Sequence, residues 1–169
     1  HPCHFPSDTC LNFSQTERPA RPGDISQAEA LALLDKAEEI GLVHTVSNVT
    51  TGVFYVCNCC GCCCGILRGI NDFGIKESVA YANYLAIIDP ELCLGCGTCI
   101  ERCQVKAISD QNGVAVVDRE RCIGCGLCVT GCPNAVARLE KKPDAEIIHP
   151  PEYFRDWEQA RLEHRGLNK

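Results

Sequence analysis

Two runs of cysteine in the second half of the chain have the spacing of metal ligands. Each run reads C-x2-C-x2-C-x3-C, one from position 93 to 103 and the other from 122 to 132. Three thiolates separated by two residues each can wrap a loop around one [4Fe-4S] cubane, while the fourth points toward a second cubane. Cluster I is then expected to be held by Cys93, Cys96, Cys99 and Cys132, and cluster II by Cys103, Cys122, Cys125 and Cys128.

Both runs lie in an internal repeat, because the segment from Ile87 to Cys99 recurs 29 positions later, from Val116 to Cys128. The copies share an apolar pair, an Asp, a Glu and a C-x-G-C-G-x-C frame. A unit this short cannot bury a core alone, so the copies are expected to pack around a pseudo-twofold axis. The alternative metal is zinc, but zinc needs two separate C-x2-C pairs per ion and suits this spacing poorly.

Short apolar runs flank each cysteine loop. Residues 85–89 and 114–118 are predicted to be strands leading into the loops, and residues 107–109 and 136–140 the strands that return. Residues 111–113 predict a hairpin turn with Gly113 available for a positive φ. The fourth cysteine of each run is expected to begin the helix after the loop. Gly95 and Gly124 are expected to let the loops pass close to the inorganic sulfides.

These motifs closely resemble the bacterial two-[4Fe-4S] ferredoxin family over about residues 84–142. The resemblance implies a βαββαβ fold with two cubanes close enough for fast electron exchange. One departure concerns the proline that usually follows the fourth cysteine. It is present as Pro133 but replaced by Gln104 in the first copy. The second copy is also one residue shorter before its return strand. Neither departure affects a ligand.

A third cysteine-rich stretch, CNCCGCCCG at residues 57–65, places six cysteines within eight positions. Neighbours in a strand point in opposite directions, so the six cannot all reach one centre. The preferred ligands of a further iron–sulfur cluster are Cys57, Cys60, Cys63 and Cys10, with Cys3, Cys59, Cys62 and Cys64 as alternatives. Two other interpretations stay open: a redox-active thiol site, and a set of small buried apolar residues.

The segment before this stretch predicts a helix feeding a hairpin. Residues 24–41 have helical periodicity, a capping box at Ser26 and Glu29, and Gly41 as a C-terminal signal. The expected apolar face consists of Ile25, Ala28, Leu31, Leu34, Ala37 and Ile40. Residues 42–46 and 53–56 are expected to be strands, with Cys57 delivered at the end of the second. His44 is expected to be a partly buried structural histidine rather than a ligand.

The sequences GLVHTVSN and VCNCCGCCCG, together with the repeat, also resemble a family of longer 4Fe-4S binding proteins from anaerobes over about residues 1–140. In that family a C-x-C-R element precedes the piece that matches Cys3 and Cys10, and here it would precede His1. The resemblance therefore implies that these two cysteines could serve a cluster completed upstream. The chain contains no Met, so its numbering is not expected to start at a translation start.

The predicted fold class is α+β, in three parts. Residues 1–75 form a Cys-rich helix and hairpin segment, residues 84–142 the two-cluster module, and residues 143–169 a C-terminal docking tail. The tail is expected to contain a charged helix over 152–165 that packs on the two-cluster module or on a larger subunit. The net charge of −6 and a pI near 5.3 argue against nucleic-acid binding. No apolar run is long enough for a membrane helix, and no signal peptide is visible.

The expected function is electron transfer, as a ferredoxin or a ferredoxin-like subunit of a larger oxidoreductase. The sequence has no nucleotide-binding loop and no Ser-His-Asp set, and tightly grouped cysteines favour a reducing compartment, the cytoplasm. Expected partners are a larger oxidoreductase subunit or a flavoprotein in a hetero-oligomer. Acidic side chains that could steer such a partner are Asp89, Glu91, Glu101, Asp118 and Glu120. The alternatives are a reductive enzyme domain, or a redox sensor, with an incompletely ligated cluster at residues 57–64.

Overall fold

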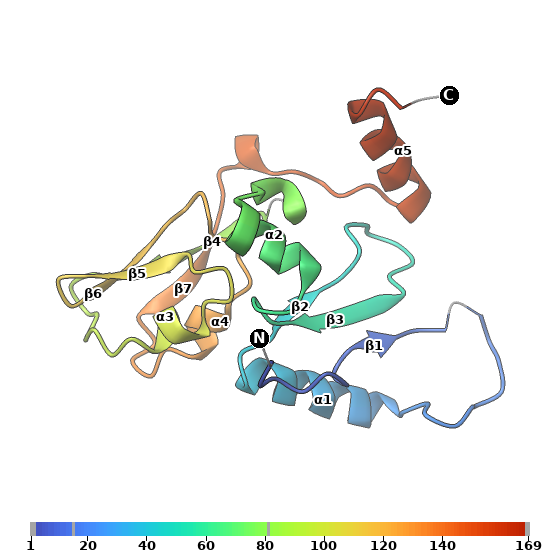
Figure 1. Cartoon of the computed structure of the whole chain (residues 1–169), viewed down its shortest axis with the longest axis horizontal. Coiled ribbons are helices and arrows are strands. Elements are labelled where there is room, and N and C mark those ends of the chain that lie inside the picture. The colour runs from blue at the N-terminus through green and yellow to red at the C-terminus, as the bar shows by residue number, and fades with distance from the viewer. Residues whose placement is uncertain (1–2, 15, 81, 168–169) are drawn as a thin grey trace.

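The computed structural model describes residues 3–14, 16–80 and 82–167. It mixes helices with small antiparallel sheets, so the α+β class is confirmed (Figure 1). Residues 84–142 form the lobe on the left of Figure 1, the first half of the chain, with its helix α1, lies beside it, and the C-terminal helix lies at the upper right. None of the described helices is both long and apolar enough to cross a membrane.

Two strand pairs build the lobe of residues 84–142. Strand β4 (Tyr84–Ile88) pairs antiparallel with β7 (Ala137–Lys141), and β5 (Ile108–Gln111) with β6 (Val114–Val117). The four predicted strands are therefore confirmed to within a few residues. The predicted turn between β5 and β6 is also confirmed, since Asn112 and Gly113 have φ of 59° and 83°.

Two short helices, α3 (Thr98–Arg102) and α4 (Leu127–Thr130), follow the cysteine loops and pack on each other. The prediction that the fourth cysteine begins a helix is wrong. Each helix already contains the third cysteine of its run, so the fourth comes at its end: Cys103 is the C-terminal cap of α3. Cys132 follows the cap of α4.

In the first half of the chain, helix α1 (Gln27–Glu39) begins at Ser26 with the predicted capping box. The predicted apolar face of α1 extends further along the helix than the buried face does. Ala37 is fully buried, but Ile25 and Leu31 are 46% and 54% exposed, because only the C-terminal turns of α1 lie against the rest of the protein. Arg102 anchors those turns: it forms an ion pair with Glu38 at 2.8 Å and donates to the carbonyls of Glu38 and Glu39.

The predicted hairpin forms from β2 (Val43–Thr45) and β3 (Tyr55–Cys59), with register Val43 to Cys59. A short strand that the sequence does not predict, β1 (Leu11–Asn12), pairs with the other side of β3. The second strand is predicted to end at residue 56, but β3 continues through Cys59. Strand β3 is central in its sheet, and cysteine is a small apolar residue that a central strand accommodates.

Helix α2 (Gly65–Phe73) follows the cysteine-rich stretch and leads to the 3-10 turn η1 (Lys76–Ser78). Leu67 and Ile70 of α2 enter a core that also contains Val43 of β2 and Val105 and Leu127 of the downstream lobe. The two halves of the chain therefore share one buried core.

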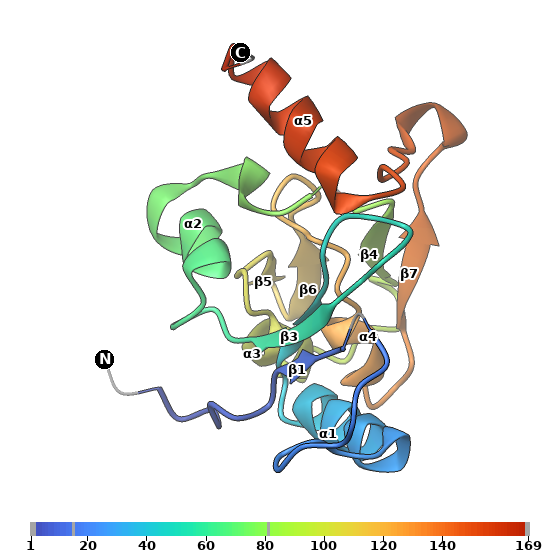
Figure 2. The ribbon, with the colours of Figure 1, turned by 90° about the vertical axis from the view of Figure 1, so that its right-hand side faces the viewer.

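The tail contains a second 3-10 turn, η2 (Asp144–Glu146), and helix α5 (Phe154–His164), which projects from the body of the protein in Figure 2. The tail helix was expected to pack on the two-cluster module or on a larger subunit. Its aromatic contact is instead with the first half of the chain. Phe154 meets Phe54 with ring centroids 6.1 Å apart, and Trp157 stacks on Phe154. Thr50 donates its backbone N–H to Pro151 in the same region.

Candidate metal centres

All sixteen cysteines lie in the described part of the chain, and all are free thiols. Their placement decides which of them could share a metal centre. Eight of them lie in the downstream repeat and eight in the upstream half.

The four cysteines predicted for cluster I line one cavity. Its wall contains Cys93, Cys96 and Cys99 of the first repeat together with Cys132 of the second, and Ile88, Ala115 and Val136 add apolar surface. Ala115 donates its N–H to the Cys93 sulfur at 3.5 Å. Such N–H groups stabilise negative charge on a ligating sulfur, so the lining fits a thiolate-bound cluster.

The backbone also favours thiolate at two of these positions. Burial raises the pKa of Cys132, but hydrogen bonds from the backbone N–H groups of residues 134–137 outweigh it and lower that pKa. The backbone N–H and the hydroxyl of Thr98 lower the pKa of Cys96. Both thiols come from loops where several N–H groups point inward, a common arrangement for holding an anion.

The four cysteines predicted for cluster II also lie together. Burial raises the pKa of Cys128 to about 12, and the nearby thiols of Cys125, Cys122 and Cys103 raise it further. Burial likewise raises the pKa of Cys103, whose sulfur accepts the Ala107 N–H at 3.1 Å. A metal binds such thiols as thiolates, so cluster binding here has to release their protons.

Glycines let both cysteine loops lie close to neighbouring backbone. A Cβ on Gly95 would stand 2.3 Å from the carbonyl oxygen of Gly113, and one on Gly124 would stand 2.5 Å from that of Tyr84. Both residues have φ of +64°. The loops thus need glycine because a neighbouring strand end or turn comes so close.

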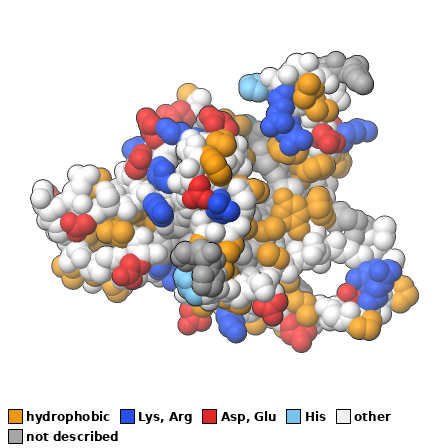
Figure 3. All heavy atoms as spheres, in the orientation of Figure 1, with side chains coloured by type: hydrophobic (Ala, Val, Ile, Leu, Met, Phe, Trp, Pro, Cys, Tyr) orange, Lys and Arg blue, Asp and Glu red, His pale blue; other side chains and the backbone are white. Residues whose placement is uncertain are grey.

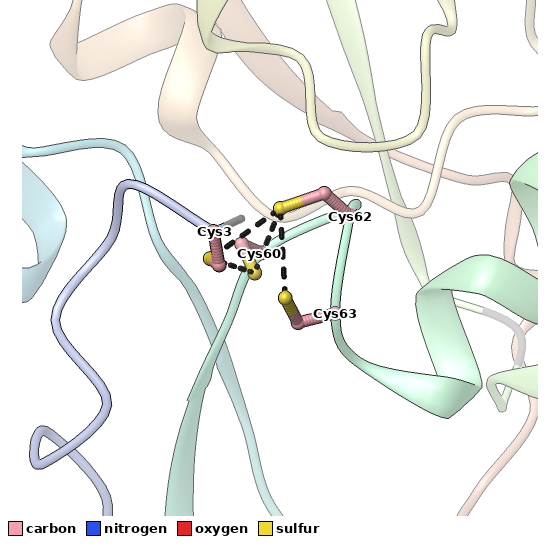
Figure 4. A group of neighbouring side chains, drawn as sticks. All are labelled: Cys3, Cys60, Cys62 and Cys63. Carbon is pink, nitrogen blue, oxygen red and sulfur yellow. Dashed lines mark hydrogen bonds between the residues drawn. The ribbon is translucent and has the colours of Figure 1, made fainter. Parts of the chain in front are cut away.

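The upstream cysteines form one compact group. Cys3 from the N-terminal segment meets Cys60, Cys62 and Cys63 from the turn between β3 and α2, and their four sulfurs all lie within 4.8 Å of one another (Figure 4). Cys3 is 3.6 Å from Cys60 and 3.5 Å from Cys62. Cys62 is 3.4 Å from Cys60 and 3.9 Å from Cys63. Because residues 61–63 form a turn, the adjacent side chains of Cys62 and Cys63 can converge.

One sulfur in this compact group is poised to ionise. Burial raises the pKa of Cys60, but hydrogen bonds from the thiols of Cys62 and Cys3 and from the N–H groups of Cys63 and Cys62 lower it to about 7. Cys60 is buried beside Ala37 and Leu42, with Phe5 packed against the same small core. The group therefore combines one buried thiol with more exposed ones.

The remaining upstream cysteines face another part of the protein. The register pairs Leu11 with Val56, so Cys10 stands opposite Cys57 one step further along. The Cys10 sulfur accepts the Asn58 N–H at 3.5 Å. Cys59 and Cys64 pack against the core shared by the two halves, where Cys103 and Cys122 of the cluster II set also pack.

The ligand set preferred from the sequence is thus divided. Cys60 and Cys63 join Cys3 and Cys62, which were the alternatives, while Cys57 and Cys10 lie outside that compact group. No signal within residues 57–64 could reveal this division, because it depends on the pairing of β1 with β3 and on the path of the N-terminal segment. The expectation that neighbouring cysteines point in opposite directions is confirmed for Cys59 and Cys60. It is wrong for Cys62 and Cys63, because these two lie in a turn and their sulfurs converge.

Gln104, which replaces the usual proline, links the two halves next to a cluster II cysteine. Its side-chain oxygen accepts the Gly61 N–H at 2.7 Å, and its side-chain nitrogen donates to the Gly41 carbonyl at 2.9 Å. Asn71 donates to the backbone carbonyls of both Gly61 and Gln104. The sequence departure therefore fixes the cysteine turn to the downstream lobe.

His44 is exposed rather than partly buried, and its recorded partner is a side chain of β3. Its Nδ1 is 2.5 Å from Oδ1 of Asn58, whose side-chain nitrogen donates to the Thr9 carbonyl. This bridge ties β2, β3 and the segment before β1 together. It agrees with a structural role for His44.

Comparison with known proteins finds a match for the downstream segment. A family described as a 4Fe-4S dicluster domain matches residues 86–138, under a third of the chain, and the match includes both cysteine runs. This segment is therefore similar to 4Fe-4S ferredoxin-type domains. No curated protein sequence matches the chain significantly. The match suggests iron–sulfur electron transfer by this segment.

Proposed function

We propose that the protein transfers electrons through [4Fe-4S] clusters, as a ferredoxin or as the ferredoxin-like subunit of a larger oxidoreductase. The observation that carries this proposal is the cavity where Cys132 of one repeat meets Cys93, Cys96 and Cys99 of the other. When bound, a cubane held by four thiolates accepts and releases single electrons and has no open position for a substrate. We assign cluster I to these four residues and cluster II to Cys103, Cys122, Cys125 and Cys128.

The packing between the two ligand sets supports close cluster spacing. Cys99 and Cys128 are both buried in one small core, and Cys93, Cys103 and Cys122 pack against it. The antiparallel pairs β4–β7 and β5–β6 agree with the βαββαβ arrangement that the resemblance implies. Apolar contact between the sets would exclude water between two centres and keep both potentials sensitive to the same surroundings.

We assign a third cluster to Cys10, Cys57, Cys59 and Cys64. Cys57 and Cys59 are two apart on β3 and so point to the same face, toward which Cys10 also projects from its position opposite Cys57. Cys59 and Cys64 pack on the core that Cys103 and Cys122 also touch. Cluster II would then stand between cluster I and this third centre, a linear order suited to passing electrons through the protein.

We expect a redox protein as the partner, such as a larger oxidoreductase subunit or a flavoprotein, in a reducing compartment such as the cytoplasm. Three of the acidic residues that could steer such a partner have contacts within the chain. Asp89 and Asp118 each accept a backbone N–H two residues on, and Glu120 pairs with Lys76 at 2.6 Å. Figure 3 shows acidic and basic side chains interspersed on the face it draws. Docking by α5, which projects from the body, is the alternative contact.

Anaerobic purification of the full chain tests this function. Iron and acid-labile sulfide should be present in equal multiples of four for the cubanes, and the visible absorption should bleach reversibly on one-electron reduction. The EPR spectrum of the reduced protein should not change when carbon monoxide or cyanide is added, because every iron has its four sulfur ligands. Protein without sulfide, or clusters that cannot be reduced reversibly, would contradict the proposal.

Reductive catalysis is a second candidate, favoured by one observation. A cavity of about 370 Å³ opens beside Cys122 and Ile123, and its lining contains four basic residues, Lys76, Arg119, Arg121 and Lys142, and one acidic residue, Glu120, which pairs with Lys76. Such a lining could attract an anionic substrate to the edge of cluster II. An EPR signal altered by small molecules would favour this candidate, or a redox sensor, over simple electron transfer.

A further inference from the structure

The compact cysteine group has the dimensions of a site for one ion. In a tetrahedral zinc site the metal–sulfur bonds of about 2.3 Å set neighbouring sulfurs about 3.8 Å apart. The four recorded sulfur separations among Cys3, Cys60, Cys62 and Cys63 run from 3.4 to 3.9 Å. All six separations are below 4.8 Å. The sulfurs already stand at the corners of a tetrahedron of the right size.

A cubane needs more room, because four irons and four sulfides stand between the ligands. The downstream sets provide an internal comparison. Among the described residues, Cys3, Cys60, Cys62 and Cys63 form the only group whose ligand atoms all approach within 4.8 Å. No three of the cysteines around the cluster I cavity have sulfurs that all lie within 4.8 Å of one another, so that set is more open. The same chain thus contains cysteine sets of two sizes.

We propose that Cys3, Cys60, Cys62 and Cys63 bind a single tetrahedrally coordinated thiophilic ion, either zinc or iron, and not a third cubane. Four thiolates in tetrahedral geometry suit zinc, and the same donor set suits a mononuclear iron. This site is separate from the third cluster assigned above, whose four ligands are the other upstream cysteines. The eight upstream cysteines then divide into two complete sets of four.

The surroundings of the site support an ion held by charge-assisted bonds. The N–H groups of Cys62 and Cys63 point at the Cys60 sulfur, which would offset part of the negative charge of a four-thiolate site. The turn that presents these residues is fixed from behind by Gln104 and Asn71 through Gly61. Three ligands therefore stand on a fixed turn, and the fourth arrives from the N-terminal segment.

Such an ion would attach the N-terminal segment to the rest of the protein. Cys3 and Phe5 pack against the core formed by Ala37, Leu42 and Cys60. Binding one ion through Cys3 adds a metal–sulfur bond to this small apolar contact. The metal would therefore fix the N-terminal segment to this small core.

Metal analysis of the anaerobically purified full chain tests the proposal. A zinc site gives one zinc per chain with equal iron and sulfide, and an iron site gives iron in excess of sulfide by one per chain. The double variant Cys62→Ser/Cys63→Ser should lose that one ion and leave sulfide unchanged. Cys96→Ser is the control, because loss of a cubane ligand should lower iron and sulfide together.

X-ray absorption on the wild-type protein gives a second test that needs no variant. A zinc site should show four sulfur neighbours at about 2.3 Å. If the ion is iron, the oxidised protein should show the EPR signal of a mononuclear high-spin ferric centre. The proposal is overturned if wild-type protein has no zinc and equal iron and sulfide, or if the double variant loses iron and sulfide in equal amounts. Protein that keeps this ion but lacks sulfide would instead refute the electron-transfer proposal alone.

Discussion

The side-chain oxygen of Gln104 accepts the backbone N–H of Gly61 at 2.7 Å, across 43 positions of sequence. This bond joins the residue after Cys103 to the turn that carries Cys60, Cys62 and Cys63. It connects a cysteine of the cluster II set with the compact cysteine group. Substitutions around it should therefore affect both.

Gln104→Leu should lower the free energy of unfolding by about 1–3 kcal/mol, because it leaves the part-buried N–H of Gly61 and carbonyl of Gly41 without their partner. Anaerobic denaturant titration followed by circular dichroism measures the change. Gln111→Leu, at an exposed strand end, is the matched control and should change stability by less than about 0.5 kcal/mol. Equal stability of the two variants would refute the bridging role of Gln104.

Gly61→Ala should destabilise the protein by about 1–3 kcal/mol or more through overpacking. Its Cβ would lie 2.1 Å from the Gln104 carbonyl oxygen and 2.8 Å from the Asn71 side-chain nitrogen. Gly65→Ala, at the first turn of α2, has no atom within 4 Å of the added Cβ and should be neutral or mildly stabilising. Thermal unfolding of the two variants, side by side, measures the contrast. A neutral Gly61→Ala would mean that the turn does not lie against Gln104.

Arg102→Ala should cost more than other arginine truncations, by about 1–3 kcal/mol. Its side chain is 18% exposed, pairs with Glu38 and donates to three carbonyls, those of Glu38, Glu39 and Leu127. Arg68→Ala is the control, because its pair with Asp72 is exposed and worth about 0.5 kcal/mol. Denaturant titration compares the two. If they cost the same, α1 does not depend on α3 for its anchoring.

The cysteine repeat allowed the downstream fold to be predicted well, because its strands and turns depend on residues that are close in sequence. Each strand stands at a fixed offset from its cysteine run, and the turn at Asn112 and Gly113 needs only its own residues. The upstream half could not be predicted in the same way. Strand β1 is only two residues long and forms through pairing with β3, more than 40 positions away.

The candidate site shows the same difference. Cys132 could be assigned to the cysteines of the first repeat because the C-x2-C-x2-C-x3-C spacing implies that the fourth cysteine serves the other cluster. In the structure Cys132 lines the same cavity as those cysteines. The six cysteines of residues 57–64 offered several equivalent registers. Only the path of the N-terminal segment, which brings Cys3 to Cys60, distinguishes them. The sequence shows Gln104 only as the replacement of a usual proline. Its bridging role could not be predicted, because its partners, Gly61 and Gly41, are distant in sequence.

Asp24 should titrate well below the other carboxyl groups. Hydrogen bonds from the Arg18 side chain and from the Arg21 N–H lower the pKa of Asp24 from 3.8 to about 2. Because the folded pKa is depressed, the stability from this contact is present above about pH 4 and lost as the pH falls toward 2. Carbon-detected NMR of the Asp24 carboxyl measures its midpoint. Arg18→Ala should return the midpoint to the ordinary range, and an unchanged midpoint would contradict the assigned contact.

The central claim is that each repeat gives its fourth cysteine to the cluster of the other repeat. Single serine variants of two ligands from each repeat test it most directly. Cys132→Ser should perturb the same cluster as Cys93→Ser, and Cys103→Ser the same cluster as Cys122→Ser. EPR of the reduced, anaerobic proteins identifies which cluster survives unaltered in each. We predict that the spectra pair in this crossed way. If Cys132→Ser instead matches Cys122→Ser, each repeat binds its own cluster, and the account given for the site is contradicted.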